Sequence, residues 1–142
     1  MKIFFIAILV LVAASVASVY LLPSPGGTRV SNDPNIVSLT GLHLHPRLTI
    51  YVKGKKLEIP HNIGIGAVHQ PIHTHDDLPI IHLEFPARVT KNDLKLSRFF
   101  KVWGKDFNEF GSTVTMTVSG SPNTELQNYM MKDGDKIELH YE

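Results

Sequence analysis

The chain has 142 residues, of which 43% are hydrophobic and 19% charged, a composition typical of one globular domain and not of a disordered chain. The formal net charge is +1, so the chain lacks the basic excess with which proteins bind nucleic acid. It has no cysteine, which excludes a disulfide scaffold, thiol catalysis and thiolate metal sites. Histidine is the informative residue type, because seven of the eight histidines lie between His43 and His82.

The chain begins with an uninterrupted apolar run, residues 3–22, which follows Lys2. A helix needs about 20 residues to cross a bilayer, so residues 1–22 are predicted to be a signal anchor with Lys2 on the inner side. The small residues at 13–18 also fit a cleavage site, and a cleaved signal peptide stays an alternative. The remainder is expected to lie on the outer face of the cell membrane as a single-pass protein, or to be secreted or periplasmic after cleavage.

The run is followed by residues 23–35, which are rich in proline, glycine, serine and asparagine and are predicted to be a flexible linker. Residues 36–142 are predicted to be one extracytoplasmic domain. Its first strands are expected at 48–52 and 56–59, which form a hairpin around Lys53-Gly54-Lys55. A further strand is expected at 79–85.

One segment has helical periodicity, because four large apolar residues, Leu96, Phe99, Phe100 and Trp103, recur at the spacing of one helix face. A helix is predicted over residues 93–103, capped by Thr90 or Asn92 and ended by Gly104. Alternating strands are expected at 113–119 and 136–141, the second after a turn at 132–135. The predicted fold class is a β-rich α+β fold, with a small, mostly antiparallel sheet or sandwich and one packed helix.

The histidines form pairs at strand spacing. His43 and His45 form one H-x-H pair, and His73 and His75 form another, while His82 precedes Glu84 by two residues. Residues i and i+2 of a strand point to the same face, so each pair can direct its side chains to one point.

Convergent neutral imidazoles are the ligands that copper and zinc accept. We expect His73, His75 and His82 to bind a divalent transition metal ion, with help from His43 or His45.

Carboxylates near these histidines are expected to accept the second ring N–H of the ligands and to orient them. Asp76 and Glu84 are the predicted residues for this role. His61 and His69 stand apart in the sequence and are expected in solvent or beside the site. His140 alternates on the last predicted strand and is expected to be structural or exposed.

Three functions fit this pattern. The first is a metal-binding protein for copper or zinc that serves storage, delivery or sensing outside the membrane. The second is a small metalloenzyme, a hydrolase or lyase with an activated water and with Glu84 or Asp76 as general base. The third is a structural or interaction domain without metal, which predicts that the nitrogens of His73, His75 and His82 do not converge. No protein partner is indicated.

Several short motifs occur together in the domain: HLHP at 43–46, IPHNIGI at 59–65, HTHD at 73–76, IIHLE at 80–84 and FFKVWG at 99–104. Jointly they resemble an uncharacterised family of exported, often membrane-anchored proteins of archaea and bacteria. The resemblance implies a small β-rich domain outside the membrane with a histidine-based site, and it implies no particular reaction. Relatives often have a cysteine shortly before HTHD, where this chain has Ala67, Val68 and His69. Ligands other than nitrogen and oxygen are therefore not expected here.

Overall fold

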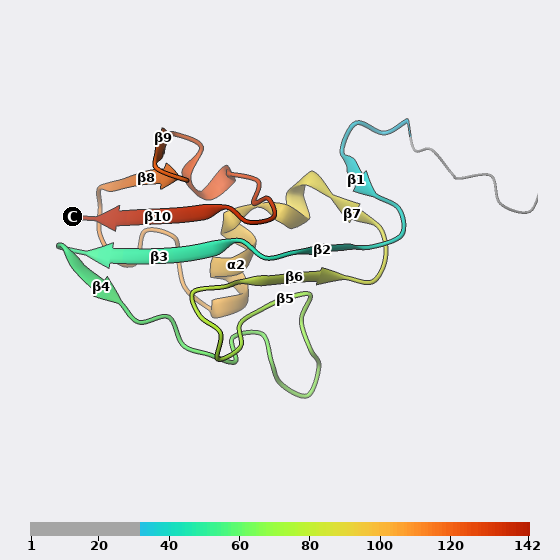
Figure 1. Cartoon of the computed structure of the whole chain (residues 1–142), viewed down its shortest axis with the longest axis horizontal. Helices are drawn as coiled ribbons and strands as arrows, with labels where there is room; N and C mark the ends of the chain where they lie inside the picture. The colour runs from blue at the N-terminus through green and yellow to red at the C-terminus, as the bar shows by residue number, and fades with distance from the viewer. Residues whose placement is uncertain (1–31) are drawn as a thin grey trace, which may run out of the picture. The chain divides into compact units, whose positions relative to one another are not determined.

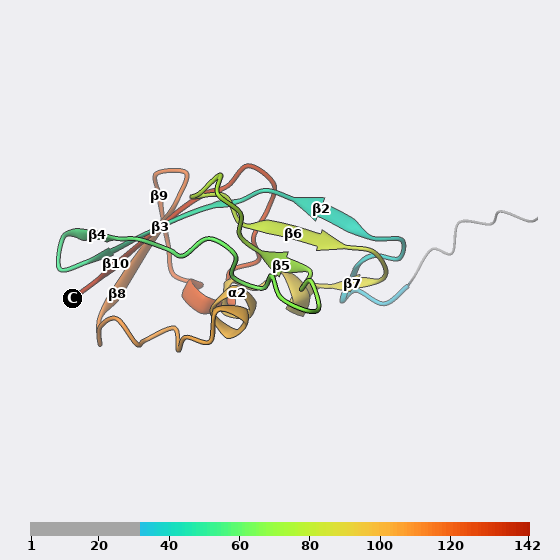
Figure 2. The same cartoon turned by 90° about the horizontal axis from the view of Figure 1, so that it is seen from below.

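The computed structural model describes residues 32–142. The predicted anchor or signal peptide, and most of the predicted linker, lie outside the described residues. No helix in the described residues is long and apolar enough to cross a membrane. Residues 32–142 form a β-rich α+β fold with one α-helix and mostly antiparallel sheets, which confirms the predicted fold class in these terms (Figures 1 and 2).

The larger sheet has five strands in the order β4-β3-β10-β8-β9. All neighbours in it are antiparallel except β3 and β10, which pair in parallel. Lys53 and Gly54, with φ of 49° and 74°, make the two-residue turn of the predicted hairpin, a conformation typical of tight hairpins. The strands are β3 (Arg47–Val52), β4 (Lys55–Leu57), β8 (Val114–Val118), β9 (Ser121–Asn123) and β10 (Lys136–Tyr141).

A smaller antiparallel sheet has three strands in the order β2 (Leu42–Leu44), β6 (His82–Phe85) and β5 (Ile72–His73). The strand expected at 79–85 is thus shorter, and it begins at His82. A two-stranded pair, β1 (Ile36–Ser38) and β7 (Val89–Thr90), completes the strands of the described residues. The sequence patterns predicted none of β1, β2, β5, β7 and β9, all of which have two or three residues.

The two larger sheets are joined through the chain between β2 and β3, which run in line with each other (Figure 1). The Ile81 N–H donates to the Pro46 carbonyl at 2.8 Å, and the Leu48 N–H donates to the Pro79 carbonyl at 2.9 Å. These bonds hold the end of β2 against the segment that enters β6. The position of β2 beside β6 is therefore held by these bonds at one end in addition to the strand pairing.

The helical segment is divided into two parts. A 3-10 turn, η1 (Lys91–Leu94), precedes the α-helix α2 (Leu96–Trp103), so the prediction of one continuous helix over 93–103 was wrong at its start. Lys95 is extended, with φ −67° and ψ 141°, because the backbone on either side bonds elsewhere. The Met131 N–H donates to the Leu94 carbonyl at 2.9 Å, and the Leu96 N–H donates to the Tyr129 carbonyl at 2.9 Å.

The predicted C-cap of the helix is present, but the predicted N-cap residue Thr90 caps η1, and the N-cap of α2 is Lys95. The Thr90 N–H and hydroxyl both donate to Asp93 Oδ2, at 2.8 and 2.6 Å, and close the first turn of η1. Gly104, with φ 75°, ends α2 in the left-handed conformation that glycine adopts without strain.

The core contains the apolar side of α2 and the inward faces of the strands. Leu96, Phe99 and Phe100 of α2 are buried, as their spacing predicted. The helix packs beside β5, on one side of the smaller sheet (Figure 2). The same cluster includes the inward residues of both larger sheets, among them Leu48, Ile50, Ile72, Leu83, Met116, Ile137 and Leu139.

Candidate metal centre

The register of the smaller sheet places imidazoles and a carboxylate on one face. His43 of β2 lies opposite Glu84 of β6, and His73 of β5 lies opposite His82 of β6. Directly paired residues share a face, and so do residues two apart on one strand. Leu83 lies between the two polar residues of β6 and faces the buried side. The sheet therefore has an apolar face toward the core and a histidine face away from it.

Three more histidines join this face from the ends of the strands. His45 follows β2, His75 follows β5, and His69 lies in the loop before β5. Together with His43, His73 and His82 they form what we call the histidine layer.

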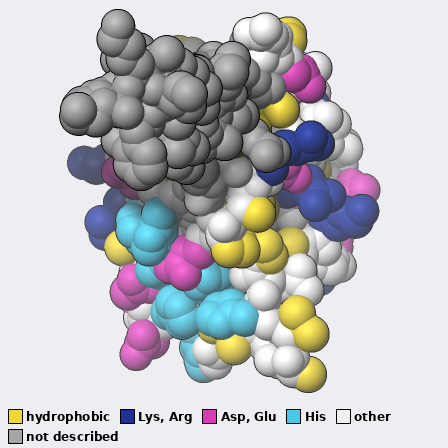
Figure 3. All heavy atoms as spheres, turned by 90° about the vertical axis from the view of Figure 1, so that its right-hand side faces the viewer, with side chains coloured by type: hydrophobic (Ala, Val, Ile, Leu, Met, Phe, Trp, Pro, Cys, Tyr) yellow, Lys and Arg dark blue, Asp and Glu magenta, His cyan; other side chains and the backbone are white. Residues whose placement is uncertain are grey.

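The rings of the layer follow one another at contact distance. The His43 and His45 centroids lie 4.6 Å apart, those of His45 and His82 5.0 Å, and those of His82 and His73 5.2 Å. The His69 ring lies 4.3 Å from that of His73. Figure 3 shows histidine and acidic side chains gathered on one face of the molecule.

Within the described residues, two groups of side chains could hold a metal ion. The β6 group consists of His43, His45, His82 and Glu84, and the β5 group consists of His69, His73 and His75. In each group one ligand atom per residue lies within 4.8 Å of all the others. Nitrogen ligands 2.0–2.1 Å from a tetrahedral ion are separated by about 3.3 Å. Ligand atoms that lie up to 4.8 Å apart would therefore have to move closer together to bind one ion.

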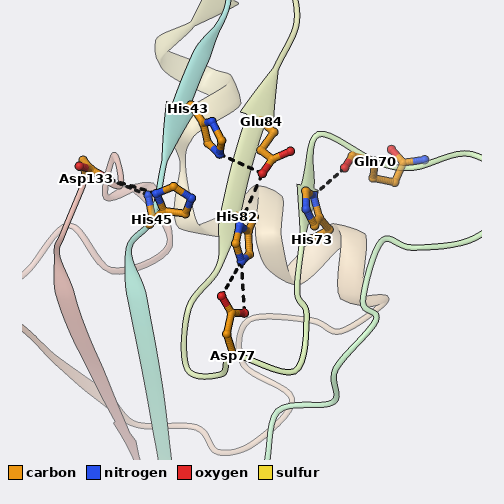
Figure 4. Close-up of polar contacts among 8 residues, drawn as sticks. All are labelled: His43, His45, Gln70, His73, Asp77, His82, Glu84 and Asp133. Carbon is orange, nitrogen blue, oxygen red and sulfur yellow. Dashed lines mark hydrogen bonds and ion pairs between the residues drawn. The ribbon is translucent and has the colours of Figure 1, made fainter.

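His73 is the most enclosed member of the layer, with 1% of its surface exposed. Its Nδ1–H donates to the Gln70 carbonyl at 3.1 Å (Figure 4), which assigns the proton to Nδ1 because a carbonyl only accepts. Nε2 is buried and has no hydrogen-bond partner. Burial holds the pKa of the ring below its ordinary value, despite the opposing hydrogen bond to Gln70. His73 is therefore a neutral imidazole with a free lone pair.

His82 has a similar arrangement. Its Nε2 lies 3.1 and 3.2 Å from the two carboxylate oxygens of Asp77, and the bond fixes the ring between Asp77 and Glu84 (Figure 4). Nδ1 is buried without a hydrogen-bond partner, 3.5 Å from Glu84 Oε1. Burial opposes ionisation of Asp77, but the hydrogen bond to His82 together with the attraction of His82 and His75 outweighs it, so the pKa of Asp77 is lowered. An ionised Asp77 accepts the Nε2–H of His82 and so orients the ring.

Asp77, and not Asp76, is thus the carboxylate that orients a histidine from this loop. Asp76 is exposed and, within the described residues, makes no hydrogen bond or ion pair with the layer. The expectation for Asp76 came from its adjacency to His75 in the sequence, whereas in the described residues Asp77 makes the contact with a histidine. Asp77 continues the two-residue spacing of His73 and His75, and this spacing was the signal that could have found it.

Glu84, the second carboxylate expected to orient a histidine, lies beside His43 in the structure. Its Oε1 lies 2.9 Å from His43 Nε2. Burial would raise the pKa of Glu84, but the nearby His43, His73 and His82 outweigh that effect and the pKa is lowered. Glu84 is therefore an anion beside members of both groups.

Thr74 anchors the H-T-H segment. Its side chain is fully buried and points away from the two histidines, toward residues 60–63. Its hydroxyl donates to the Pro60 carbonyl at 2.9 Å and accepts the Ile63 N–H at 3.1 Å. The Thr74 N–H donates to the Ile63 carbonyl, and the Asn62 N–H donates to the Thr74 carbonyl. These four bonds hold the backbone between His73 and His75.

His45 is held from the other end of the chain. Its backbone N–H donates to Asp133 Oδ1 at 2.8 Å, and its ring Nδ1 lies 3.8 Å from the same oxygen. Asp133 belongs to the turn that precedes β10, and the Arg47 N–H donates to the Asp135 carbonyl of that turn. The predicted turn at 132–135 therefore helps to position the layer, which its sequence did not indicate.

The structure brings together all five histidines that the sequence nominated, and it distributes them over two groups. The rings of His73, His75 and His82 lie 4.8–5.2 Å from one another, but His82 belongs to the β6 group while His73 and His75 belong to the β5 group, so the three expected ligands do not form one group. His69 joins the β5 group, although it was expected only beside the site. Two histidines lie outside the layer: His61, which contacts Asn62, and His140, which stacks on Tyr51.

A pocket of about 650 Å³ lies against the histidine face. It is lined from the β6 group by His43 and Glu84, and from the β5 group by His69 and His73. The rest of its wall comes from residues 40–42, Gln70, Pro71, Phe85 and Pro86. The volume is in the range of small-molecule sites. Residues of both groups therefore line one pocket.

Residues 32–142 thus form a β-rich α+β domain whose histidine clusters could hold a metal ion. Comparisons with protein-family models, with curated proteins and with solved structures found no match to this chain. Membership of the family that the motifs resemble stays a prediction. The functional argument depends on the geometry of the site itself.

Proposed function

We propose that this protein binds a divalent transition metal ion, copper or zinc, through the histidine layer, and that the β5 group is its principal site. The observation that carries the proposal is the state of His73. A buried imidazole nitrogen without a partner is costly unless something binds it. The ring is neutral and its free nitrogen faces the rings of His69 and His75. A metal ion satisfies all three nitrogens together.

The donor set favours copper and zinc. Imidazole suits Zn²⁺ and Cu²⁺, and the chain has no thiolate to favour Cu⁺. Three imidazoles from His69, His73 and His75 leave one position of a tetrahedral ion for water or for a further ligand. His73 is further oriented by the Gln70 carbonyl, the kind of partner that fixes the tautomer of a metal ligand.

The proposal places the domain outside the cell membrane, where it would serve metal storage, delivery or sensing. The apolar run at 3–22 supports this location. Membrane association would come through the N-terminal segment alone.

The test is metal binding by the full chain, purified in detergent because of its apolar run and stripped of metal by a chelator. Calorimetric titration with Zn²⁺ and with Cu²⁺ should show stoichiometric binding. The variant His73→Ala/His75→Ala should lose the ion of the β5 group, and His61→Ala should keep it. Elemental analysis of protein taken from its native compartment names the ion. Native protein that is metal-free and titrates with neither ion would overturn the proposal.

The pocket beside the layer favours a second candidate function, a small hydrolase or lyase. An ion held by the β5 group would face the pocket with an open position, and Glu84 on the same wall could accept a proton from its bound water. Zinc-loaded protein would then hydrolyse activated esters, and Glu84→Gln would abolish the rate while the zinc content of the β5 group stays unchanged. Equal rates for zinc-loaded protein and free zinc would exclude this candidate.

A further inference from the structure

We propose that the β6 group is a second metal site, so that the histidine layer holds two ions side by side. This inference rests on the proposed function and extends it, because the β5 group alone is enough to bind a single ion. The β6 group has its own donor set, three imidazoles from His43, His45 and His82 and the carboxylate of Glu84.

The case for the second site begins with His82, whose side chain is 12% exposed. Its Nδ1 is buried without a hydrogen-bond partner, and its Nε2 is held by Asp77. His73 shows a related combination in the β5 group: one nitrogen is engaged by an acceptor and the other has no hydrogen-bond partner, although His82 Nδ1 also lies 3.5 Å from Glu84 Oε1. Within the described residues, only these two histidines have a buried ring nitrogen without a hydrogen-bond partner. Each belongs to a different group.

These two nitrogens cannot bind the same ion without rearrangement of the rings. His82 belongs with His43, His45 and Glu84, and His73 belongs with His69 and His75. The His73 and His82 rings are stacked, with centroids 5.2 Å apart and 11° between their planes. Stacked rings direct their nitrogens along parallel planes and not to a common point between them. The geometry therefore favours two neighbouring ions over one ion bound by both rings.

The wall of the pocket shows how two positive ions could lie so close. Glu84 lines it together with His43 on one side and His69 and His73 on the other. A carboxylate between two dications reduces their repulsion, and its second oxygen is available as a bridging ligand. We therefore expect the second ion to bind more weakly than the first and to depend strongly on Glu84.

The proposal is tested by stoichiometry on the full chain in detergent. Zinc titration should reach two equivalents for the wild type and for His140→Ala, whose histidine lies outside the layer. His45→Ala should lose one equivalent and keep the ion of the β5 group, since the backbone N–H bond to Asp133 survives this substitution. His69→Ala should lose the other equivalent. If His45→Ala fails to fold, as judged by circular dichroism, His43→Ala replaces it, because that side chain is 59% exposed.

Copper gives a second measurement. Two adjacent Cu²⁺ ions should produce a spin-coupled electron paramagnetic resonance spectrum in the wild type, and either single-site variant should show an isolated ion instead. One equivalent in the wild type that His45→Ala leaves unchanged would overturn the second site and leave the proposed function standing. One equivalent lost in both variants would also overturn it, because the layer would then be one shared site. No binding at all would refute both proposals.

Discussion

The sharpest structural prediction concerns Thr74, whose hydroxyl is the buried link between the H-T-H segment and residues 60–63. Thr74→Val keeps the shape of the side chain and removes the hydroxyl, so the Ile63 N–H and the Pro60 carbonyl both lose their partner. A buried group left unsatisfied costs about 1–3 kcal/mol. The Pro60 carbonyl is only partly buried, so we expect the variant to be about 2–4 kcal/mol less stable.

The assay is thermal unfolding followed by circular dichroism, in the presence of a chelator so that metal binding does not contribute. A domain of this size shifts its Tm by about 4 °C per kcal/mol, so Thr74→Val should unfold about 8–16 °C below the wild type. Thr74→Ser is the control, since it keeps both hydrogen bonds and loses one methyl group, worth about 1 kcal/mol. Equal Tm values for Thr74→Val and Thr74→Ser would refute the reasoning.

The other predictions test the loop, the orienting carboxylate and the neutral imidazole. Gly64→Ala should destabilise the domain in denaturant titration by more than about 1 kcal/mol, because φ of Gly64 is +73° and the new Cβ would lie 2.4 Å from a β5 carbonyl oxygen. Gly66→Ala is the control: its new Cβ would have no heavy atom within 4 Å, so its stability should not change. Asp77→Asn should weaken zinc binding by the β6 group by about 10–100-fold in a competition assay, because Asp77 orients His82 of that group. Asp76→Asn should not change it, and equal losses would contradict the assignment. Because the pKa of His73 is lowered from 6.5, the unfolded chain binds a proton more readily below that pH, so acidification should destabilise metal-free wild type more than His73→Gln. Parallel pH profiles of unfolding free energy would show that the ring is not held neutral.

Much of the histidine layer could be predicted because strand periodicity is local. The spacing of two in H-x-H predicted that each pair would direct its side chains to one side, and pairing with β6 then brought the pairs together. Division into two groups could not be predicted, because it depends on which of three strands lies in the middle. Strand order among short strands is set by packing between distant segments and not by local pattern.

Two features were not predicted, the break at Lys95 and the position of His69, and both depend on backbone hydrogen bonds to residues that lie elsewhere in the chain. The break at Lys95 exists because residues 129–131 bond to the backbone on both sides of it, more than 30 positions along the chain. His69 appeared isolated because a loop brings it back to β5, and Gly64 accepts the Gln70 N–H at 2.8 Å to close that loop. Neither contact produces a periodic pattern in the sequence from which it could be predicted.

The alternation along β6 also constrains how such a protein can change over generations. Leu83 supports the core while the residues on either side of it, His82 and Glu84, serve the polar face. Inserting or deleting one residue in this strand would turn the imidazole and carboxylate into the core and expose the leucine. Loss of binding and loss of folding would then come from the same event. Length variation in this lineage should therefore be confined to the loops, and β6 should keep its length.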